Sequence, residues 1–245
     1  FQSGSLEAIQ QTYAKVKDER YTRLHLDHCP VIDEDQFRVD YEDVIGRALA
    51  VGYDSVMVDG SRLPLAENIA VTRRVVAMAH AAGRPVEAEL GAVMGHEAGP
   101  LPPYEELFAS GRGFTDVAEA ARFVRETGVD WLSVAIGNIH GAISAARHDK
   151  KVPARLNIQH LAAIRAATGI PLVLHGGTGI RREYLRDAVR NGIAKINIAT
   201  AIRQPYEALK DKDPKAACDG VYRAAIEQIV EELGVAGNAA VLSAG

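Results

Sequence analysis

The sequence predicts an α/β protein, and within that class a (β/α)8 TIM barrel rather than an open doubly wound sheet. Helical and strand-like segments alternate along the 245 residues, and strict alternation requires parallel strands joined by right-handed crossovers. The Gly-x-Gly-x-x-Gly turn that open sheets of this kind often carry does not occur in the sequence. Three strand-like runs also end near a histidine, and a barrel gathers such residues at one end of its strands.

The predicted elements repeat one pattern, in which a helix ends near a glycine and a short apolar strand follows. Helices are predicted over residues 6–17, 41–50, 65–82, 115–128, 157–169 and 181–192. Thr115 and Asn157 are the expected N-caps of two of them. Strands are predicted over residues 22–28 (ending before Pro30), 54–60 and 85–91, and from residues 129, 170 and 193. We expect the first strand, the first helix and most of the second strand of the barrel to precede Phe1.

Composition and charge limit the class of protein. With 47% hydrophobic residues the chain can bury one large core, so we expect a single barrel domain over residues 1–245, with a C-terminal helix and tail at about 215–245. A net charge of −4 with both signs interspersed gives no reason to expect nucleic acid or a membrane as partner. Only Cys29 and Cys218 are present, which favours a reducing, cytoplasmic setting.

Three histidines come just after three separate apolar β-type runs, and they are His28, His140 and His175. Because parallel strands all finish on one side of their sheet, we expect these imidazoles to converge. One such histidine alone is more often a hydrogen-bonded core or surface residue. Three of them, with a fourth position open, are typical of a catalytic zinc site.

Carboxylates also lie at or near the predicted strand ends. Asp59 and Glu89 belong to two neighbouring predicted strands, and Glu87 lies on the same strand face as Glu89. Carboxylates that point into a barrel mouth are costly unless they are paired or bind a cation, so one interpretation is a second metal or a monovalent cation. Asp27, beside His28, either orients a ligand or transfers protons, and the sequence leaves both roles open.

Two short turns, at residues 176–180 and 197–200, lead from predicted strands into predicted helices. Helix N-termini bind anions, and barrels frequently hold phosphate after their last two strands. A glycine turn alone is as often a simple tight turn, but two beside a metal site favour phosphate. The glycine-rich residues 92–113 are expected to act as a lid, whereas the basic residues 142–155 are more typical of a solvated surface loop.

Six linked motifs together resemble the class II, metal-dependent ketose-bisphosphate aldolases. They are HLDH at 25–28, SVMVDGS at 55–61, EAELG at 87–91, VAIG at 134–137 with HG at 140–141, LHGG at 174–177, and KINIAT at 195–200. The resemblance covers about residues 6–210. It implies a (β/α)8 barrel that cleaves a ketose 1,6-bisphosphate, usually fructose or tagatose, into dihydroxyacetone phosphate and glyceraldehyde 3-phosphate, in carbohydrate metabolism such as glycolysis. Members are commonly homodimers or homotetramers.

The resemblance also implies residue roles. The implied ligands of the catalytic Zn2+ are His28, His140 and His175, and the implied second or alternate metal site has Asp59 and Glu89. Asp27 matches the catalytic acid/base, which takes the proton from the C4 hydroxyl in cleavage, and Glu97 falls where a glutamate exchanges the proton on the nucleophilic carbon. The positions that match dihydroxyacetone-phosphate contacts are Gly141, Gly176, Gly177, Thr178, Asn197, Ile198, Ala199 and Thr200. Zinc acts as Lewis acid in this mechanism, so Lys195 is not needed as a Schiff-base lysine.

Departures from the family pattern bear on the substrate. Residues 142–144 lack the aromatic and the lysine that relatives usually carry, so one phosphate contact is either lost or supplied by Arg147, and the segment 30–41 is longer than in common members. An alternative is therefore an aldolase of the same fold for a different sugar phosphate, such as a deoxy, sulfo or inositol-derived one. A metal-dependent hydrolase and a non-catalytic metal-binding barrel subunit are the alternatives of other classes.

Overall fold

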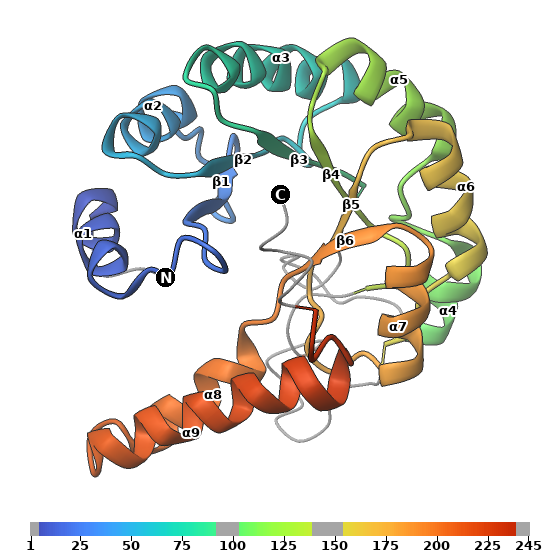
Figure 1. Cartoon of the computed structure of the whole chain (residues 1–245). Coiled ribbons are helices and arrows are strands. Elements are labelled where there is room, and N and C mark those ends of the chain that lie inside the picture. Colours follow the sequence, from blue (N-terminus) through green and yellow to red (C-terminus); the bar gives the residue numbers. More distant parts are fainter. Residues whose placement is uncertain (1–4, 92–102, 139–153, 239–245) are drawn as a thin grey trace.

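The computed structural model of the chain describes residues 5–91, 103–138 and 154–238, and its strands form one curved parallel sheet (Figure 1). The strands are β1 (His25–Pro30), β2 (Ser55–Asp59), β3 (Val86–Leu90), β4 (Trp131–Val134), β5 (Leu172–Leu174) and β6 (Ile193–Ile196). Their order in the sheet is the order in the chain. Winding that never reverses is the topology of a barrel, whereas a doubly wound sheet changes direction once. The α/β barrel prediction is confirmed.

The helices lie on the outer, convex side of the sheet, and the last two pair with each other and project away from it (Figure 1). They are α1 (Leu6–Val16), α2 (Tyr41–Val51), α3 (Leu65–Ala81), α4 (Tyr104–Ser110), α5 (Val117–Thr127), α6 (Ile158–Thr168), α7 (Arg182–Arg190), α8 (Thr200–Leu209) and α9 (Pro214–Glu227), followed by a π-helical turn (Gln228–Glu232). None of the described helices is both long and apolar enough to cross a bilayer.

Two local predictions at element boundaries are wrong. Asp116, not Thr115, caps α5, because its carboxylate accepts the first free N–H groups of the helix while the Thr115 hydroxyl is buried and donates to the carbonyl of Leu90. Pro30 does not end β1 but is its last paired residue. A proline is tolerated there because β1 is an edge strand of the described sheet. The other predicted N-cap, Asn157, is confirmed.

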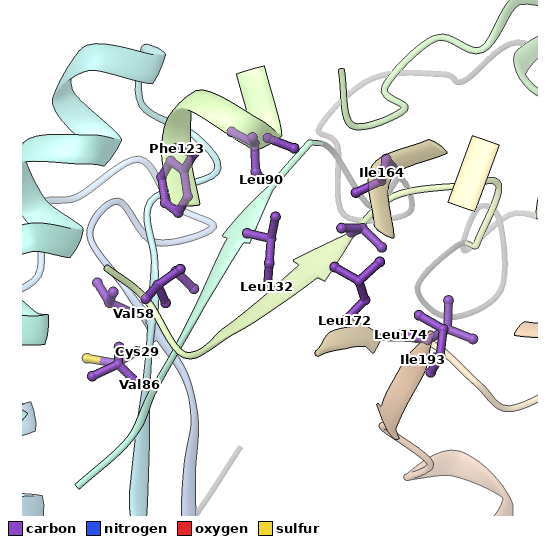
Figure 2. Close-up of a cluster of buried hydrophobic side chains, with 14 of the residues drawn as sticks. Cys29, Val58, Val86, Leu90, Phe123, Leu132, Ile164, Leu172, Leu174 and Ile193 are labelled. Carbon is purple, nitrogen blue, oxygen red and sulfur yellow. The ribbon is translucent and has the colours of Figure 1, made fainter. Parts of the chain in front are cut away.

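The two faces of the sheet differ in polarity because side chains alternate along each strand. Residues such as Val86, Leu132 and Leu172 point outward and are buried in one hydrophobic cluster that includes Phe123 of α5 and Ile164 of α6 (Figure 2). Full burial of such side chains contributes about 1.5–3 kcal/mol each. The intervening residues line the concave side, and many of them are polar or charged: His25, Asp27, Ser55, Asp59, Glu87, Glu89, Ser133 and Lys195. The sheet therefore presents its reactive groups inward.

Candidate metal centre

The end of β1 carries a bulge that turns two neighbouring side chains to the same region. The pairing register with β2 shifts between Leu26 and Cys29, and His28 has φ of 48°, in the left-handed region that non-glycine residues seldom adopt. In a regular strand Asp27 and His28 would point to opposite faces. With the bulge, ligand atoms of Asp27, His28 and His175 all lie within 4.8 Å of one another.

His175, at the end of β5, lies fully buried between two carboxylates of β3. Its Nε2 is 2.9 Å from Oε1 of Glu87, and its Nδ1 is 3.1 Å from Oε2 of Glu89. The Asn138 side-chain amide donates to the carbonyl oxygen of His175 at 3.1 Å. Burial acts to lower the pKa of His175, but the hydrogen bonds with Glu87 and Glu89 outweigh it and raise the pKa to about 9. Ring and backbone are therefore both held in place.

Asp59 connects His28 to a second group of ligand atoms. Its Oδ2 lies 3.6 Å from Nδ1 of His28, and its Oδ1 accepts from the backbone N–H and the hydroxyl of Ser61 at 3.0 and 2.6 Å. Burial acts to raise the pKa of Asp59, but the bonds from His28 and Ser61 outweigh it and lower the pKa to about 2. Ligand atoms of His28, Asp59 and Glu89 also lie within 4.8 Å of one another.

The donor set in these two groups fits a divalent metal. Imidazole nitrogens and carboxylate oxygens are ligands that zinc takes in proteins, and His28 is shared by the group with Asp27 and His175 and by the group with Asp59 and Glu89. The third histidine of the predicted site, His140, lies outside the described residues, as do Glu97 and Gly141.

Asp27 is held by two side chains from the β6 end of the sheet. The side-chain amide of Asn197 donates to both of its carboxylate oxygens at 3.0 Å, and Nζ of Lys195 lies 3.4 Å away. Burial acts to raise the pKa of Asp27, but the positive charges of Lys195, His28 and His175 together outweigh it and leave the pKa below its ordinary value. The carboxylate is therefore ionised at neutral pH and able to accept a proton.

The two predicted phosphate-binding turns lie next to each other. The backbone N–H of Gly177 donates to the carbonyl of Asn197 at 3.0 Å, and the Thr178 hydroxyl accepts from the N–H of Ala201 at 3.4 Å. A Cβ at Gly177 would come within 2.6 Å of the Ile196 side chain, so close packing on β6 by itself requires glycine there. The N-termini of α7 and α8 follow these turns.

The described part of the predicted lid, residues 103–113, contains a helix rather than only a loop. Tyr104 and Leu107 of α4 are buried, which explains why this part packs on the barrel. The Tyr104 hydroxyl lies 3.1 Å from the carbonyl oxygen of Gly137 and 3.0 Å from that of Arg155, and it accepts from the N–H of Arg155. The rest of the predicted lid and most of the predicted basic loop lie outside the described residues.

Several residues that touch the predicted site were not among the predicted site residues, although Glu87 was noted as a carboxylate on the same strand face as Glu89. Two of them, Lys195 and His25, lie close to Asp27. The other two, Glu87 and Asn138, contact His175. The available signal was strand parity, because Glu87 lies two residues before Glu89, and Lys195 two before Asn197.

Comparisons with known proteins agree with this fold. The family model described as fructose-bisphosphate aldolase class-II matches residues 1–239. A fructose-bisphosphate aldolase of Streptococcus pyogenes is 40% identical over 178 residues, which cover 72% of this chain and 52% of the relative. A 6-phospho-5-dehydro-2-deoxy-D-gluconate aldolase of Shouchella clausii is 42% identical over 177 residues, with the same coverage.

A solved structure supports the same assignment. The YdjI aldolase from Escherichia coli K12 superposes with a TM-score of 0.73 at 30% identity, and the match covers 97% of this chain and 79% of that one. The chain spans about half the length of the curated relatives reported above, at 52%. The strand order, the family model and these likenesses lead to one conclusion: the chain belongs to the class II fructose-bisphosphate aldolase family.

Proposed function

We propose that this chain carries the active site of a metal-dependent aldolase, which cleaves a ketose phosphate into dihydroxyacetone phosphate and an aldehyde and catalyses the reverse condensation. One observation carries the proposal. An ionised carboxylate, Asp27, lies beside His28 and His175, with ligand atoms of all three within 4.8 Å. A metal-assisted aldol cleavage needs a base beside the Lewis acid, and this cluster supplies the base next to a group of metal ligands.

We assign separate roles to the residues of the site. His28 and His175, together with His140, are the proposed ligands of Zn2+, and a metal bound there would polarise the carbonyl group of the substrate. Asp59 and Glu89 are proposed to line a second or alternate cation position. Asp27 is proposed to accept the proton of the C4 hydroxyl in cleavage and to return it in condensation.

Substrate recognition is proposed to follow the same layout. The adjacent turns at residues 176–178 and 197–200 precede two helix N-termini, where backbone N–H groups bind phosphate well. We propose that they, with Gly141, hold the three-carbon phosphate and that Glu97 exchanges the proton on its nucleophilic carbon. Asn197 has a further task in the structure, because its side chain is bonded to Asp27.

The identity of the substrate sugar is proposed separately from the reaction. Fructose 1,6-bisphosphate is the first substrate to test, because the Streptococcus pyogenes relative is named for it. A relative of equal coverage is named for 6-phospho-5-dehydro-2-deoxy-D-gluconate, which keeps a deoxy sugar phosphate as the second candidate.

The test is a coupled assay of dihydroxyacetone phosphate release. Zinc-loaded and chelator-treated protein would be compared on fructose 1,6-bisphosphate, tagatose 1,6-bisphosphate and 6-phospho-5-dehydro-2-deoxy-D-gluconate. Metal-dependent release from one sugar supports the proposal and identifies the substrate. Zinc binding without release from any of them would favour a non-catalytic barrel subunit, and release that survives chelation would exclude the metal from the mechanism.

We further propose a homodimer or homotetramer of single-domain protomers in the cytoplasm. Apolar side chains remain exposed on α8, α9 and the turn after them, and they are Tyr206, Leu209, Tyr222, Ile226, Ile229 and Val230. Exposed apolar patches on a folded domain often mark contacts with another chain. Both cysteines, Cys29 and Cys218, are free thiols, and free thiols are common in proteins of a reducing compartment. Light scattering of the purified protein measures the number of protomers.

A further inference from the structure

Glu87 is a buried charged group that the proposed reaction does not use. It lies in the middle of β3 with a side chain that is 0% exposed, where an isolated carboxylate is strongly unfavourable. Its two oxygens have separate partners. Oε1 lies 2.9 Å from Nε2 of His175, and Oε2 lies 2.8 Å from Nζ of Lys195. The carboxylate is therefore held from two sides, by β6 and by the residue that follows β5.

Lys195 reaches this carboxylate from β6, an edge strand of the described sheet. Its Nζ also lies 3.4 Å from Oδ1 of Asp27 on β1, so one ammonium group bridges carboxylates on β1 and β3. Ligand atoms of His25, Asp27 and Glu87 lie within 4.8 Å of one another. A second metal ion is not needed among them, because the lysine already supplies a positive charge to both carboxylates. The same contacts argue against Lys195 as a Schiff-base nucleophile, which needs a free amine.

The contact with Glu87 decides which nitrogen of His175 is available to a metal. A metal-binding histidine uses one ring nitrogen and donates the N–H of the other to an acceptor, often a carboxylate, which fixes the ring. In His175, Nε2 is bonded to the buried Glu87, whereas Nδ1 lies on the side of Glu89, a member of the second group of ligand atoms. Nδ1 is therefore the nitrogen that faces Glu89 and the second group of ligand atoms.

We propose that Glu87 and Lys195 are positioning residues for the metal. Lys195 fixes the carboxylate of Glu87, and Glu87 fixes the ring of His175 with Nδ1 toward the metal. The inference rests on the metal binding that the proposed function requires, but not on the identity of the sugar.

The consequence of losing either residue follows from the distances. Without Lys195, the remaining partner of Glu87 Oε2 within the described ranges is the more distant His25, whose Nε2 lies 3.4 Å away. The carboxylate then rotates more freely, and His175 loses its fixed acceptor. Metal affinity should fall although every proposed ligand is still present.

The experiment measures Zn2+ affinity by competition with a chromophoric chelator, and the visible absorption of the Co2+ form as a reporter of ligand geometry. The variants are Glu87→Gln, Lys195→Met and Lys195→Arg, with Lys210→Met as the control because Lys210 is exposed on the end of α8. Glu87→Gln and Lys195→Met should bind Zn2+ about 10-fold to 100-fold more weakly and change the Co2+ spectrum. Lys195→Arg should recover part of the affinity, and Lys210→Met should leave it unchanged.

Unchanged affinity and an unchanged Co2+ spectrum in both Glu87→Gln and Lys195→Met would overturn the proposal. If those variants fail to fold, as judged by circular dichroism, Glu87→Asp decides. It keeps the charge but draws the carboxylate back from His175, so weaker Zn2+ binding supports the proposal and wild-type binding overturns it.

These readouts are independent of aldol cleavage. If the wild-type protein cleaves no sugar but Glu87→Gln binds Zn2+ more weakly than wild type, the proposed function is wrong and this inference stands. An active aldolase with unchanged affinity in every variant does the reverse.

Discussion

His175 and His28 lie beside each other, with ring centroids 4.4 Å apart, but the protein holds them in opposite ways. The side chain of His175 is 0% exposed, follows a short regular strand and lies within 3.1 Å of two carboxylates. The side chain of His28 is 36% exposed, lies in a bulge with φ of 48°, and has Asp59 at 3.6 Å. One half of the site is fixed by burial and charge, and the other by an unusual backbone conformation.

The difference indicates that the two halves of the site have separate roles. Buried groups held by hydrogen bonds and charge pairs change position little, so the half around His175 is suited to hold a metal. A left-handed φ in a non-glycine residue costs of order 1–3 kcal/mol, and such residues cluster at functional sites. At β1 that strain brings Asp27, with a side chain 43% exposed, to the accessible side of the cluster. The exposed half is therefore the half that we expect to meet the substrate.

The largest expected effect is in the exposed half. Asp27→Ala should lower the rate of cleavage by about 10²–10⁴-fold, because it removes the proposed general base, while Zn2+ stays bound. Steady-state turnover together with metal content by elemental analysis checks this. Wild-type turnover would remove the acid/base role of Asp27, and loss of Zn2+ would show that the two halves are not separable. A non-catalytic metal-binding barrel subunit would not depend on Asp27.

The second prediction concerns metal removal. At a free Zn2+ concentration 100 times its Kd, the metal should stabilise the protein by about 2.7 kcal/mol relative to the chelated form. His175→Ala should abolish this gain, whereas Asp27→Ala should keep it, because only the former removes a ligand of the buried half. Urea unfolding with and without Zn2+ measures the difference, and an equal loss in both variants contradicts the comparison.

The third prediction concerns Asp59, the partner of His28. Its pKa falls from an ordinary 3.8 to about 2 in the folded protein, which corresponds to about 2 kcal/mol of stability. A lowered carboxyl pKa stabilises the fold above the unfolded value, so this contribution is complete above about pH 5 and is lost as pH falls from about 4 to about 2. Urea unfolding of chelated wild type and Asp59→Asn should differ by this amount at pH 6 and converge near pH 2. A difference independent of pH contradicts the assignment.

The smallest expected effect is in the buried half. The hydroxyl of Ser133 on β4 lies 3.3 Å from Oε2 of Glu89, and Ser133→Ala should destabilise the fold by about 1 kcal/mol. Ser110→Ala is the comparison for an exposed serine, because Ser110 lies at the end of α4 and its hydroxyl donates locally, to the carbonyl of Leu107 at 3.1 Å. Urea midpoints at neutral pH compare the two. A larger loss in Ser110→Ala than in Ser133→Ala would show that this hydrogen bond does not contribute to the rigidity of the buried half.

Much of the fold was predictable because its signals are local. Alternation of helix and strand, glycines near helix ends and apolar runs of strand length all act within a few residues, and six predicted strands correspond to β1 to β6. The wrong local predictions arose where a side chain contacts residues that are distant in sequence. Thr115 looked like an N-cap, yet its hydroxyl is engaged with the carbonyl of Leu90 at the end of β3. Residues 103–113 looked like part of a loop, yet Tyr104 packs against the residues after β4.

The site shows the same division. The sequence alone predicts which side chains lie at or near the strand ends, among them Asp27, His28, Asp59, Glu89 and His175, because strand direction fixes where such residues lie. Two features depend on the folded structure: a bulge turns Asp27 and His28 toward His175, and Lys195 holds Glu87, more than 100 residues away in sequence. The physical reason is that side-chain periodicity belongs to one segment. Strand register, sheet curvature and the pairing of buried charges depend on several segments at once.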